Sequence, residues 1–291
     1  MRSSTTGPAD NLAGETSPYT IRQNTTVHTP STQQIKPPLT HFRNFFPPQP
    51  LETGARKPRD LIMSAPGPLF IIGTGPMIGS HIPRLFATHN FTRIALFARS
   101  ENTLSASREV IATAAPSVSI DSYATDVTDT AGFTHVLQRA VREVGPPEVV
   151  VYNAARVSYG TFGLYKEEDI VEDFKIPNLG LYTTAKVLLP CLQAFAKEKP
   201  ESHPALFVTS SPIIHQPFAP VFSLSMAKAA QANLVKLLIE QAKDEVHVAL
   251  VTIGGPVSEQ EPVNNPANIA AKFWELWEQK KGSWQIEFLV Q

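Results

Sequence analysis

The stretch from Pro68 to Arg99, PLFIIGTGPMIGSHIPRLFATHNFTRIALFAR, decides the fold of this chain. It contains two continuous apolar runs, Leu69–Ile72 and Ile94–Phe97, which are typical of strands inside a sheet. Between the two runs, apolar residues recur at helical spacing, at Ile82, Leu85 and Phe86. The stretch therefore predicts a strand, a glycine turn, a helix and a second strand.

The turn after the first strand is rich in glycine and leads directly into the predicted helix. In a unit of this kind, glycines let the chain turn sharply against a pyrophosphate, whose charge lies at the positive, donor-rich end of the helix. A glycine-rich turn alone is also found as a plain tight turn, but here two strands flank it. We expect a dinucleotide site whose phosphate-binding residues include Gly73, Gly75, Ile78 and Gly79.

Arg99 closes the second predicted strand, twenty residues after Gly79. An NAD site typically carries Asp or Glu at this point for the ribose 2′-hydroxyl, whereas an NADP site carries Arg for the 2′-phosphate. The sequence Ala98-Arg99-Ser100 therefore favours NADP(H) as the cofactor.

Strands and helices alternate through the remainder of the chain. Further strands are predicted over 118–123, 148–152, 205–208 and 246–252, and further helices over 101–114, 129–143, 179–197 and 222–243. This alternation predicts one doubly wound α/β domain of the Rossmann type, with a parallel sheet and helices on both faces. Its ligand is expected beyond the carboxyl ends of the strands, where Gly73, Arg99, Asp126, Asn153, Ser211 and Gly254 lie.

From Leu69 to Gln291 the chain resembles the short-chain dehydrogenases/reductases. The motifs that carry the resemblance are Gly73-x-x-x-Met77-Ile78-Gly79, Asp126-Val127, Tyr152-Asn153-Ala154-Ala155 and Gly254-Gly255-Pro256-Val257. The resemblance implies that Asp126 contacts the adenine, that Asn153 belongs to the cofactor site, and that the backbone at Val257 borders the nicotinamide. It also implies a homodimer or homotetramer formed through the two long helices, and a role in small-molecule or secondary metabolism.

The family's catalytic set is a serine, a tyrosine about thirteen residues later and a lysine four further on. Ser211 and Lys228 keep this register, but position 224 between them is leucine and the nearest aromatic residue is Phe222. The family's asparagine position falls on Pro177, with Asn178 one residue away. We therefore expect Ser211 and Lys228 as the catalytic residues, with Lys228 also holding the cofactor ribose.

Four assignments have plainer alternatives. Ser211 precedes a proline and is also consistent with a turn hydroxyl, and Lys186, a further candidate for cofactor binding, is also consistent with a surface residue. Two residues are candidates to replace the tyrosine as proton donor: His215, otherwise a solvated loop residue, and Tyr159, otherwise part of a pocket wall.

Residues 1–65 differ in composition from residues 66–291, the predicted nucleotide-binding domain. They are rich in Ser, Thr, Pro, Gln and Asn and have no sustained apolar period, which predicts a disordered tail. Scattered arginines leave a transit peptide as an alternative, which the acidic residues and prolines oppose. A third interpretation is that the functional protein starts at Met63.

Composition excludes several classes of function. The net charge of −1 provides no basic field for nucleic acid, and no apolar run approaches the ~20 residues that span a bilayer. The single cysteine, Cys191, cannot form an internal disulfide and is expected in core packing, which fits a reducing compartment. We therefore expect a cytoplasmic protein with a small-molecule substrate, no nucleic-acid or membrane partner and no metal.

Together these observations predict an NADP(H)-dependent oxidoreductase that acts on a small or mid-sized apolar carbonyl or enone. The alternative is a protein that keeps the fold without the redox step, either an isomerase, cyclase or lyase, or a cofactor-binding protein without turnover. Leu224 and Pro177 favour the alternative, while Arg99, Asp126 and Lys228 favour the oxidoreductase.

Overall fold

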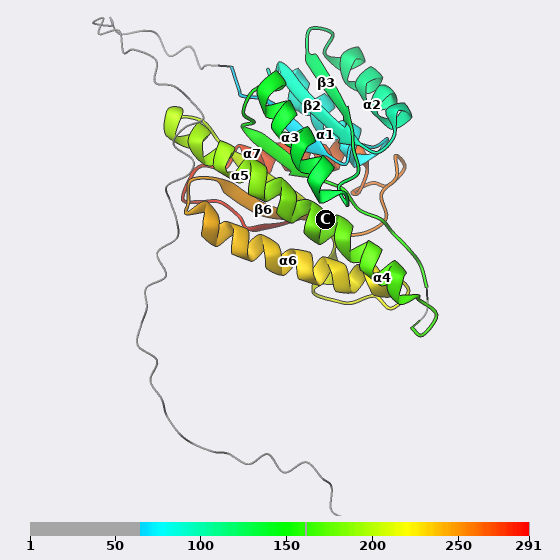
Figure 1. Cartoon of the computed structure of the whole chain (residues 1–291). Helices are drawn as coiled ribbons and strands as arrows, with labels where there is room; N and C mark the ends of the chain where they lie inside the picture. The colour runs from blue at the N-terminus through cyan, green and yellow to red at the C-terminus, as the bar shows by residue number, and fades with distance from the viewer. Residues whose placement is uncertain (1–64, 161, 291) are drawn as a thin grey trace, which may run out of the picture. The chain divides into compact units, whose positions relative to one another are not determined.

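The computed structural model describes residues 65–160 and 162–290, which form a seven-stranded, wholly parallel sheet in the order β3-β2-β1-β4-β5-β6-β7 (Figure 1). The strand order reverses at β1 and β4, as in a doubly wound sheet whose ligand cleft opens at that switch point. The predicted Rossmann-type fold is confirmed. The predicted tail and its alternatives at residues 1–64 lie outside the described residues.

Strands and helices alternate along the described chain. The strands are β1 (Leu69–Ile72), β2 (Arg93–Ala98), β3 (Ser119–Ala124), β4 (Val149–Tyr152), β5 (Ala205–Ser210), β6 (His247–Ile253) and β7 (Glu287–Val290). The α-helices are α1 (Ile78–Thr88), α2 (Glu101–Ala114), α3 (Thr130–Val144), α4 (Glu167–Phe174), α5 (Leu181–Glu198), α6 (Phe222–Ala242) and α7 (Pro266–Trp277). A π-helical turn (Lys175–Gly180) joins α4 to α5, and a short 3₁₀ turn (Pro212–Ile214) follows β5.

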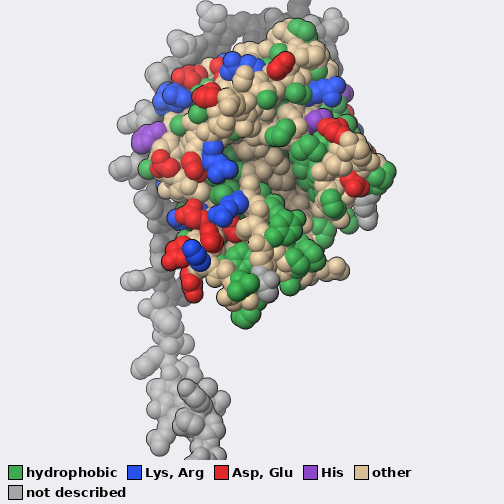
Figure 2. All heavy atoms as spheres, turned by 90° about the vertical axis from the view of Figure 1, so that its right-hand side faces the viewer, with side chains coloured by type: hydrophobic (Ala, Val, Ile, Leu, Met, Phe, Trp, Pro, Cys, Tyr) green, Lys and Arg blue, Asp and Glu red, His purple; other side chains and the backbone are tan. Residues whose placement is uncertain are grey.

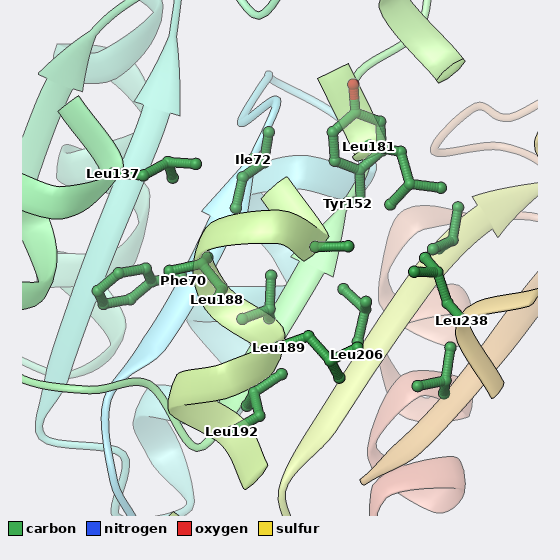
Figure 3. Close-up of a cluster of buried hydrophobic side chains, with 14 of the residues drawn as sticks. Phe70, Ile72, Leu137, Tyr152, Leu181, Leu188, Leu189, Leu192, Leu206 and Leu238 are labelled. Atoms are coloured by element: carbon green, nitrogen blue, oxygen red, sulfur yellow. The ribbon is translucent and has the colours of Figure 1, made fainter. Parts of the chain in front are cut away.

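Two hydrophobic cores hold the helices on the two faces of the sheet. One core packs α3, α5 and α6 against one face, and leucines of α5 point toward the strand residues Phe70, Ile72 and Leu206 (Figure 3). The other core places α1, α2 and α7 on the opposite face. Since both faces are covered, β1 and β4 are buried at every position, as expected for the central strands of a parallel sheet.

Two of the predicted helices begin directly after a side-chain cap. The Ser100 hydroxyl accepts a hydrogen bond from the Thr103 amide at the start of α2, and the Asp129 carboxylate accepts one from the Gly132 amide at the start of α3. Both side chains satisfy amides that lack an intrahelical partner.

The helix predicted over 179–197 is longer in the structure. Helical backbone runs without a break from α4 through the π-helical turn into α5, so that helix begins at Glu167. The prolines at 177 and 190 lie within this helix and do not end it.

Two elements near the C-terminus were not predicted. Helix α7 packs on α1, where Trp274 and Trp277 lie against Phe86 with ring centroids 5.1 and 6.0 Å apart. Strand β7 adds to the edge of the sheet beside β6, with Glu287 in register with Leu250. The four residues of β7 include a charged one and are too few to show a strand period.

By length and composition, one helical segment of the described chain is a candidate membrane span. It covers Glu167–Glu198 and has a mean hydropathy of 1.2 over an 18-residue window, half of which is buried inside the fold. Its apolar side chains in α5 belong to the core against the sheet. Burial also raises the pKa of the Cys191 thiol on this helix, which fits the expected packing role better than a nucleophile.

We predict that α7 contributes strongly to stability through Phe273. This side chain is fully buried and its ring lies 6.2 Å from that of Phe207. Phe273→Ala is expected to lower the free energy of unfolding by about 3–5 kcal/mol, because it opens a cavity in the core. Urea denaturation measures this value. The half-exposed Phe218 is the control, since Phe218→Ala should cost less than about 0.5 kcal/mol, and equal losses in the two variants would contradict the prediction.

Candidate functional site

A cleft of about 320 Å³ opens at the carboxyl ends of the central strands. It is lined by residues that follow β1, β2, β3 and β4: Gly73, Thr74, Gly75, Phe97, Ala98, Arg99, Ser100, Thr103, Thr125, Asp126, Val127, Asn153, Ala154, Ala155 and Ile176. The face turned to the viewer in Figure 2 is hollowed at its centre, with charged side chains on one side and hydrophobic ones on the other. Five predicted cofactor residues meet in this cleft: Gly73, Gly75, Arg99, Asp126 and Asn153.

Gly73 forms the floor of the cleft, in a conformation that requires glycine. Its φ is +88°, and a Cβ on it would lie 2.5 Å from the amide nitrogen of Ala154. Its amide donates to the Phe97 carbonyl at 2.9 Å, and its carbonyl accepts from the Asn153 side-chain amide at 2.9 Å. The glycine turn is therefore fixed to the ends of both neighbouring strands.

The two other glycines of the turn have different surroundings. A Cβ on Gly75 would meet no atom within 4 Å, so the backbone there is open to a ligand. A Cβ on Gly79 would lie 2.8 Å from the Gly73 carbonyl oxygen, so Gly79 lets α1 pack closely on the turn. No side chain caps the start of α1 at Met77, which leaves its first amides free for an anion.

The rim of the cleft carries a cation and hydroxyl groups. Arg99 is exposed beside Ser100 and Thr103, and within the described residues its guanidinium forms no ion pair. A guanidinium without a carboxylate partner can bind a phosphate through paired hydrogen bonds. Ser100 and Thr103 were not predicted as site residues, although their hydroxyls follow Arg99 on the first turn of α2.

Asp126 and Asn153 are fixed by backbone contacts. One carboxylate oxygen of Asp126 accepts from the amide and the hydroxyl of Thr128, both at 2.8 Å. The Asn153 amide donates to the Ile72 carbonyl at 2.8 Å, which continues the pairing of β1 and β4. Both residues therefore present fixed polar groups along the cleft.

Lys228 is a buried cation on α6. Its side-chain nitrogen donates to the Thr209 carbonyl and to the Gln231 side-chain oxygen, each at 2.8 Å. Burial lowers the pKa of this ammonium to about 8. A protonated lysine has three donors, so one N–H remains beyond these two contacts.

The position four residues before Lys228 carries no proton. Leu224 is buried, and a residue four positions away on a helix lies on the same face. Ser211, directly after β5, is half-buried, and its hydroxyl makes no hydrogen bond to any residue that the structure describes. The Ser211 hydroxyl is therefore free to bind a ligand oxygen.

The lining of the cleft does not include five predicted cofactor residues, which are Ile78, Gly79, Lys186, Lys228 and Val257, or the predicted catalytic residue Ser211. Ile78 and Val257 are half-buried and pack against the core between the sheet and α1 and α7. Lys186 is exposed on α5. A lysine at an exposed helix position is the ordinary solvated case.

The two candidate proton donors, His215 and Tyr159, lie away from the lining of the cleft. The Nε2 atom of His215 lies 2.8 Å from a carboxylate oxygen of Glu287, which also accepts from the Thr252 hydroxyl at 2.9 Å. Tyr159 is 77% exposed in the loop after β4. Neither residue lines the cleft.

The structure also contains a buried polar group that the sequence reasoning missed. Gln231 is fully buried and contacts Lys228, three residues before it. A glutamine one helical turn after a lysine in an otherwise apolar stretch was the available signal.

Comparison with known proteins supports the family resemblance. The sequence profile of short chain dehydrogenase matches residues 69–265. No curated protein matches this chain.

Solved structures share the fold at low sequence identity. An alcohol dehydrogenase from the archaeon Thermococcus sibiricus, complexed with 5-hydroxy-NADP, is 20% identical, covers 77% of this chain and 95% of its own, and has a TM-score of 0.67. L-sorbose reductase from Gluconobacter frateurii, complexed with NADPH and L-sorbose, is 20% identical over 78% of this chain and 95% of its own, with a TM-score of 0.69. An NADPH-bound short chain oxidoreductase from Pseudomonas aeruginosa PAO1, described as containing an atypical catalytic center, is 19% identical. The match covers 77% of this chain and 95% of that protein, with a TM-score of 0.67.

We predict that Gly73→Ala damages the cleft more than a matched change at an open site. Gly163 also has a positive φ, +82°, but a Cβ there would meet no atom within 4 Å. Both substitutions strain the backbone by about 1–2 kcal/mol, and Gly73→Ala adds an overlap that costs a further ~1–3 kcal/mol. Urea denaturation of the two variants measures the difference. Equal unfolding free energies would show that the contact with Ala154 imposes no constraint.

Proposed function

Because this chain belongs to the short chain dehydrogenase family, we propose that it is an NADP(H)-dependent oxidoreductase acting on a small or mid-sized apolar carbonyl or enone. The observation that carries the proposal is the unpaired Arg99 at the rim of a cleft with a glycine floor. Neighbours of the same fold bind NADP or NADPH, which supports this choice of cofactor.

The residues of the cleft fit a dinucleotide phosphate. The open backbone at Gly75 and the uncapped start of α1 would hold the pyrophosphate, and Arg99 would hold the 2′-phosphate with the Ser100 hydroxyl beside it. Asp126 and Asn153 would contact the remainder of the molecule. When bound, NADPH supplies a hydride, which carries both electrons of the reduction.

The chain's own residues would orient the substrate and the ribose. The third N–H of Lys228 would donate to a ribose hydroxyl, and the free Ser211 hydroxyl would hold the substrate oxygen. Orientation of two reactants is a large source of rate enhancement. Hydride transfer therefore does not require the family's tyrosine, which Leu224 replaces here.

The absence of an ionisable group at Leu224 restricts the substrate. A positioned general acid typically contributes about 10²–10⁴-fold, and the two candidate replacements are engaged elsewhere or exposed, since His215 contacts Glu287 and Tyr159 is in an exposed loop. An enone spreads the negative charge of the product anion over several atoms, so that water can supply the proton after the hydride has been transferred. An enone is therefore the better substrate for this cleft than a simple ketone.

Exposed apolar side chains near the entrance support an apolar substrate. The loop between β4 and α4 carries Tyr159, Phe162 and Leu164, all at least 77% exposed. This loop contacts the start of α6, since Gly160 bridges to Val221 and the Phe162 ring lies 5.4 Å from that of Phe222. The loop begins at the cleft-lining residues 153–155, and its apolar side chains would exclude water if they closed over a bound apolar molecule.

Assembly, location and metabolic role complete the proposal. Leu179, Tyr182, Met226 and Leu237 are exposed apolar residues along α5 and α6 and the turn before α5, and they would be covered in a homodimer or homotetramer. We place the protein in the cytoplasm and in secondary metabolism, as the family resemblance implies.

The alternative is a non-redox protein with the same cleft, either an isomerase, cyclase or lyase, or a binding protein without turnover. The buried Leu224 beside Lys228 favours it. The two functions differ in stoichiometry: the oxidoreductase should consume one NADPH per product molecule formed, followed by absorbance at 340 nm alongside product analysis. Product formed with NADPH unchanged would establish the alternative.

We predict that Arg99→Ala removes the preference for NADPH over NADH. The guanidinium would contact only the 2′-phosphate, so NADPH affinity should fall roughly tenfold to a hundredfold while NADH affinity stays within about twofold. Fluorescence titration of the full chain measures both constants. Arg108→Ala, at an exposed position of the same α2 segment, is the control and should change neither. If Arg99→Ala lowered the affinities for NADPH and NADH equally, Arg99 would not be the residue that binds the 2′-phosphate.

A further inference from the structure

Lys228 is joined to the π-helical turn through one side chain. The Gln231 side-chain oxygen accepts from Lys228 at 2.8 Å, and its side-chain nitrogen donates to the Pro177 carbonyl at 2.8 Å. Gln231 is fully buried. The three groups form a chain of hydrogen bonds from α6 to the turn between α4 and α5.

The π-helical turn exposes carbonyl groups that need partners. Proline has no amide hydrogen, so Pro177 breaks the ordinary helix pairing, and the wider turn shifts the neighbouring bonds. Side chains donate to carbonyls of this turn and of its neighbours. Tyr152 donates to the Ile176 carbonyl, and Asn178 donates to the carbonyls of Phe174 and Ala227, each at 3.1 Å. The contact with Ala227 fixes the backbone directly before Lys228.

Only an amide of this length can make both contacts of Gln231. The oxygen must face the ammonium and the NH₂ must face the carbonyl, since the reverse orientation would oppose two donors and two acceptors. An ionised glutamate keeps the acceptor toward Lys228 but loses the donor toward Pro177, and leucine loses both.

We propose that Gln231 is a positioning residue that fixes the Lys228 ammonium to the π-helical turn and leaves its third N–H for a ligand hydroxyl. The fixed ammonium is a property of the free protein. Its use in binding a nucleotide ribose rests on the proposed function.

The surroundings of Lys228 make this support necessary. Among the described residues, no carboxylate lies within ion-pair distance of its side-chain nitrogen, and its acceptors are the neutral oxygens of Thr209 and Gln231. Burial lowers the pKa of Lys228 to about 8, so the charged form depends on these two oxygens.

The neighbouring elements carry few groups that titrate. On β4, Tyr152 has a pKa raised by burial and, to a lesser extent, by Asp126, so its hydroxyl stays neutral. On α4, which also packs on α6, the buried Asp173 carboxylate pairs with Arg156 and accepts from the Ser158 hydroxyl. At the start of the π-helical turn, Lys175 pairs with Glu172. A change in the titration of Lys228 therefore reports on Gln231.

The direct test is the titration of Lys228 in the full chain without nucleotide. Lysine labelled with ¹³C at Cε gives the midpoint by NMR, and Lys228→Met assigns the signal. The midpoint should lie near 8 in the unchanged chain. Gln231→Glu should raise it by about one unit or more, because an opposite charge favours the ammonium, whereas Gln231→Leu should lower it. Gln241→Leu, at an exposed position of α6, should leave it unchanged.

Midpoints that stay unchanged in both Gln231 variants, even with a lower melting temperature, would overturn the proposal, because a packing role alone does not move the titration. If Gln231→Leu fails to fold, Gln231→Glu decides by the same criterion.

A second measurement separates this inference from the proposed function. Gln231→Leu should weaken NADPH binding roughly tenfold or more, and Gln231→Glu should stay within a few-fold of the unchanged chain. Failure of the unchanged chain to bind NADPH would refute the proposed function, while the NMR titration still decides the role of Gln231. Equal NADPH affinities in the unchanged chain and both Gln231 variants would refute the claim that Gln231 directs the third N–H of Lys228 to a ligand.

Discussion

The backbone of Gly73 is the constraint on which the cleft depends. Its left-handed conformation lets the chain leave β1 and turn between β2 and β4, with the Phe97 carbonyl on one side and the Asn153 side chain on the other. A side chain at this position would overlap the backbone of Ala154. The close approach of Gly79 to the Gly73 carbonyl then sets α1 against the turn, directly after the cleft-lining residues Gly73 and Gly75.

A second constraint is the buried charge of Lys228. An ammonium without a carboxylate is costly inside a protein, and here neutral oxygens and the π-helical turn support it. The arrangement keeps a donor at the end of β5 although Leu224 provides no acid beside it. The residues that would bind and orient a nucleotide are thus present without a residue that donates a proton. We therefore favour substrates whose product anion is delocalised.

The sequence predicted the fold well because its signals are local. The apolar runs of β1 and β4 and the caps at Ser100 and Asp129 each act within a few residues, and all appear in the structure. Strand β7 was missed because it depends on pairing with β6, thirty or more residues away. The continuation of α4 into α5 was missed for a similar reason, because distant residues contact the turn between them. Tyr152 donates to the Ile176 carbonyl and Gln231 donates to the Pro177 carbonyl.

The site was only partly predictable from the sequence. The residues at strand ends, such as Arg99 and Asp126, were found because topology alone brings them together. Lys186 and Tyr159 proved exposed, and His215 contacts Glu287, a residue of the unpredicted strand. Gln231 escaped notice because its role appears only when α6 packs on the π-helical turn.

Hydrogen–deuterium exchange of the full chain with and without NADPH tests the central claim most directly. If the cleft is a dinucleotide site, NADPH should slow exchange in the segments around 73–75, 97–103, 125–127 and 153–155, which line it, and in the start of α1 that follows the first of them. Absence of protection at ~1 mM NADPH, a concentration at which a complex of about −4 kcal/mol is half-formed, would contradict the account. Protection confined to other segments would contradict it equally.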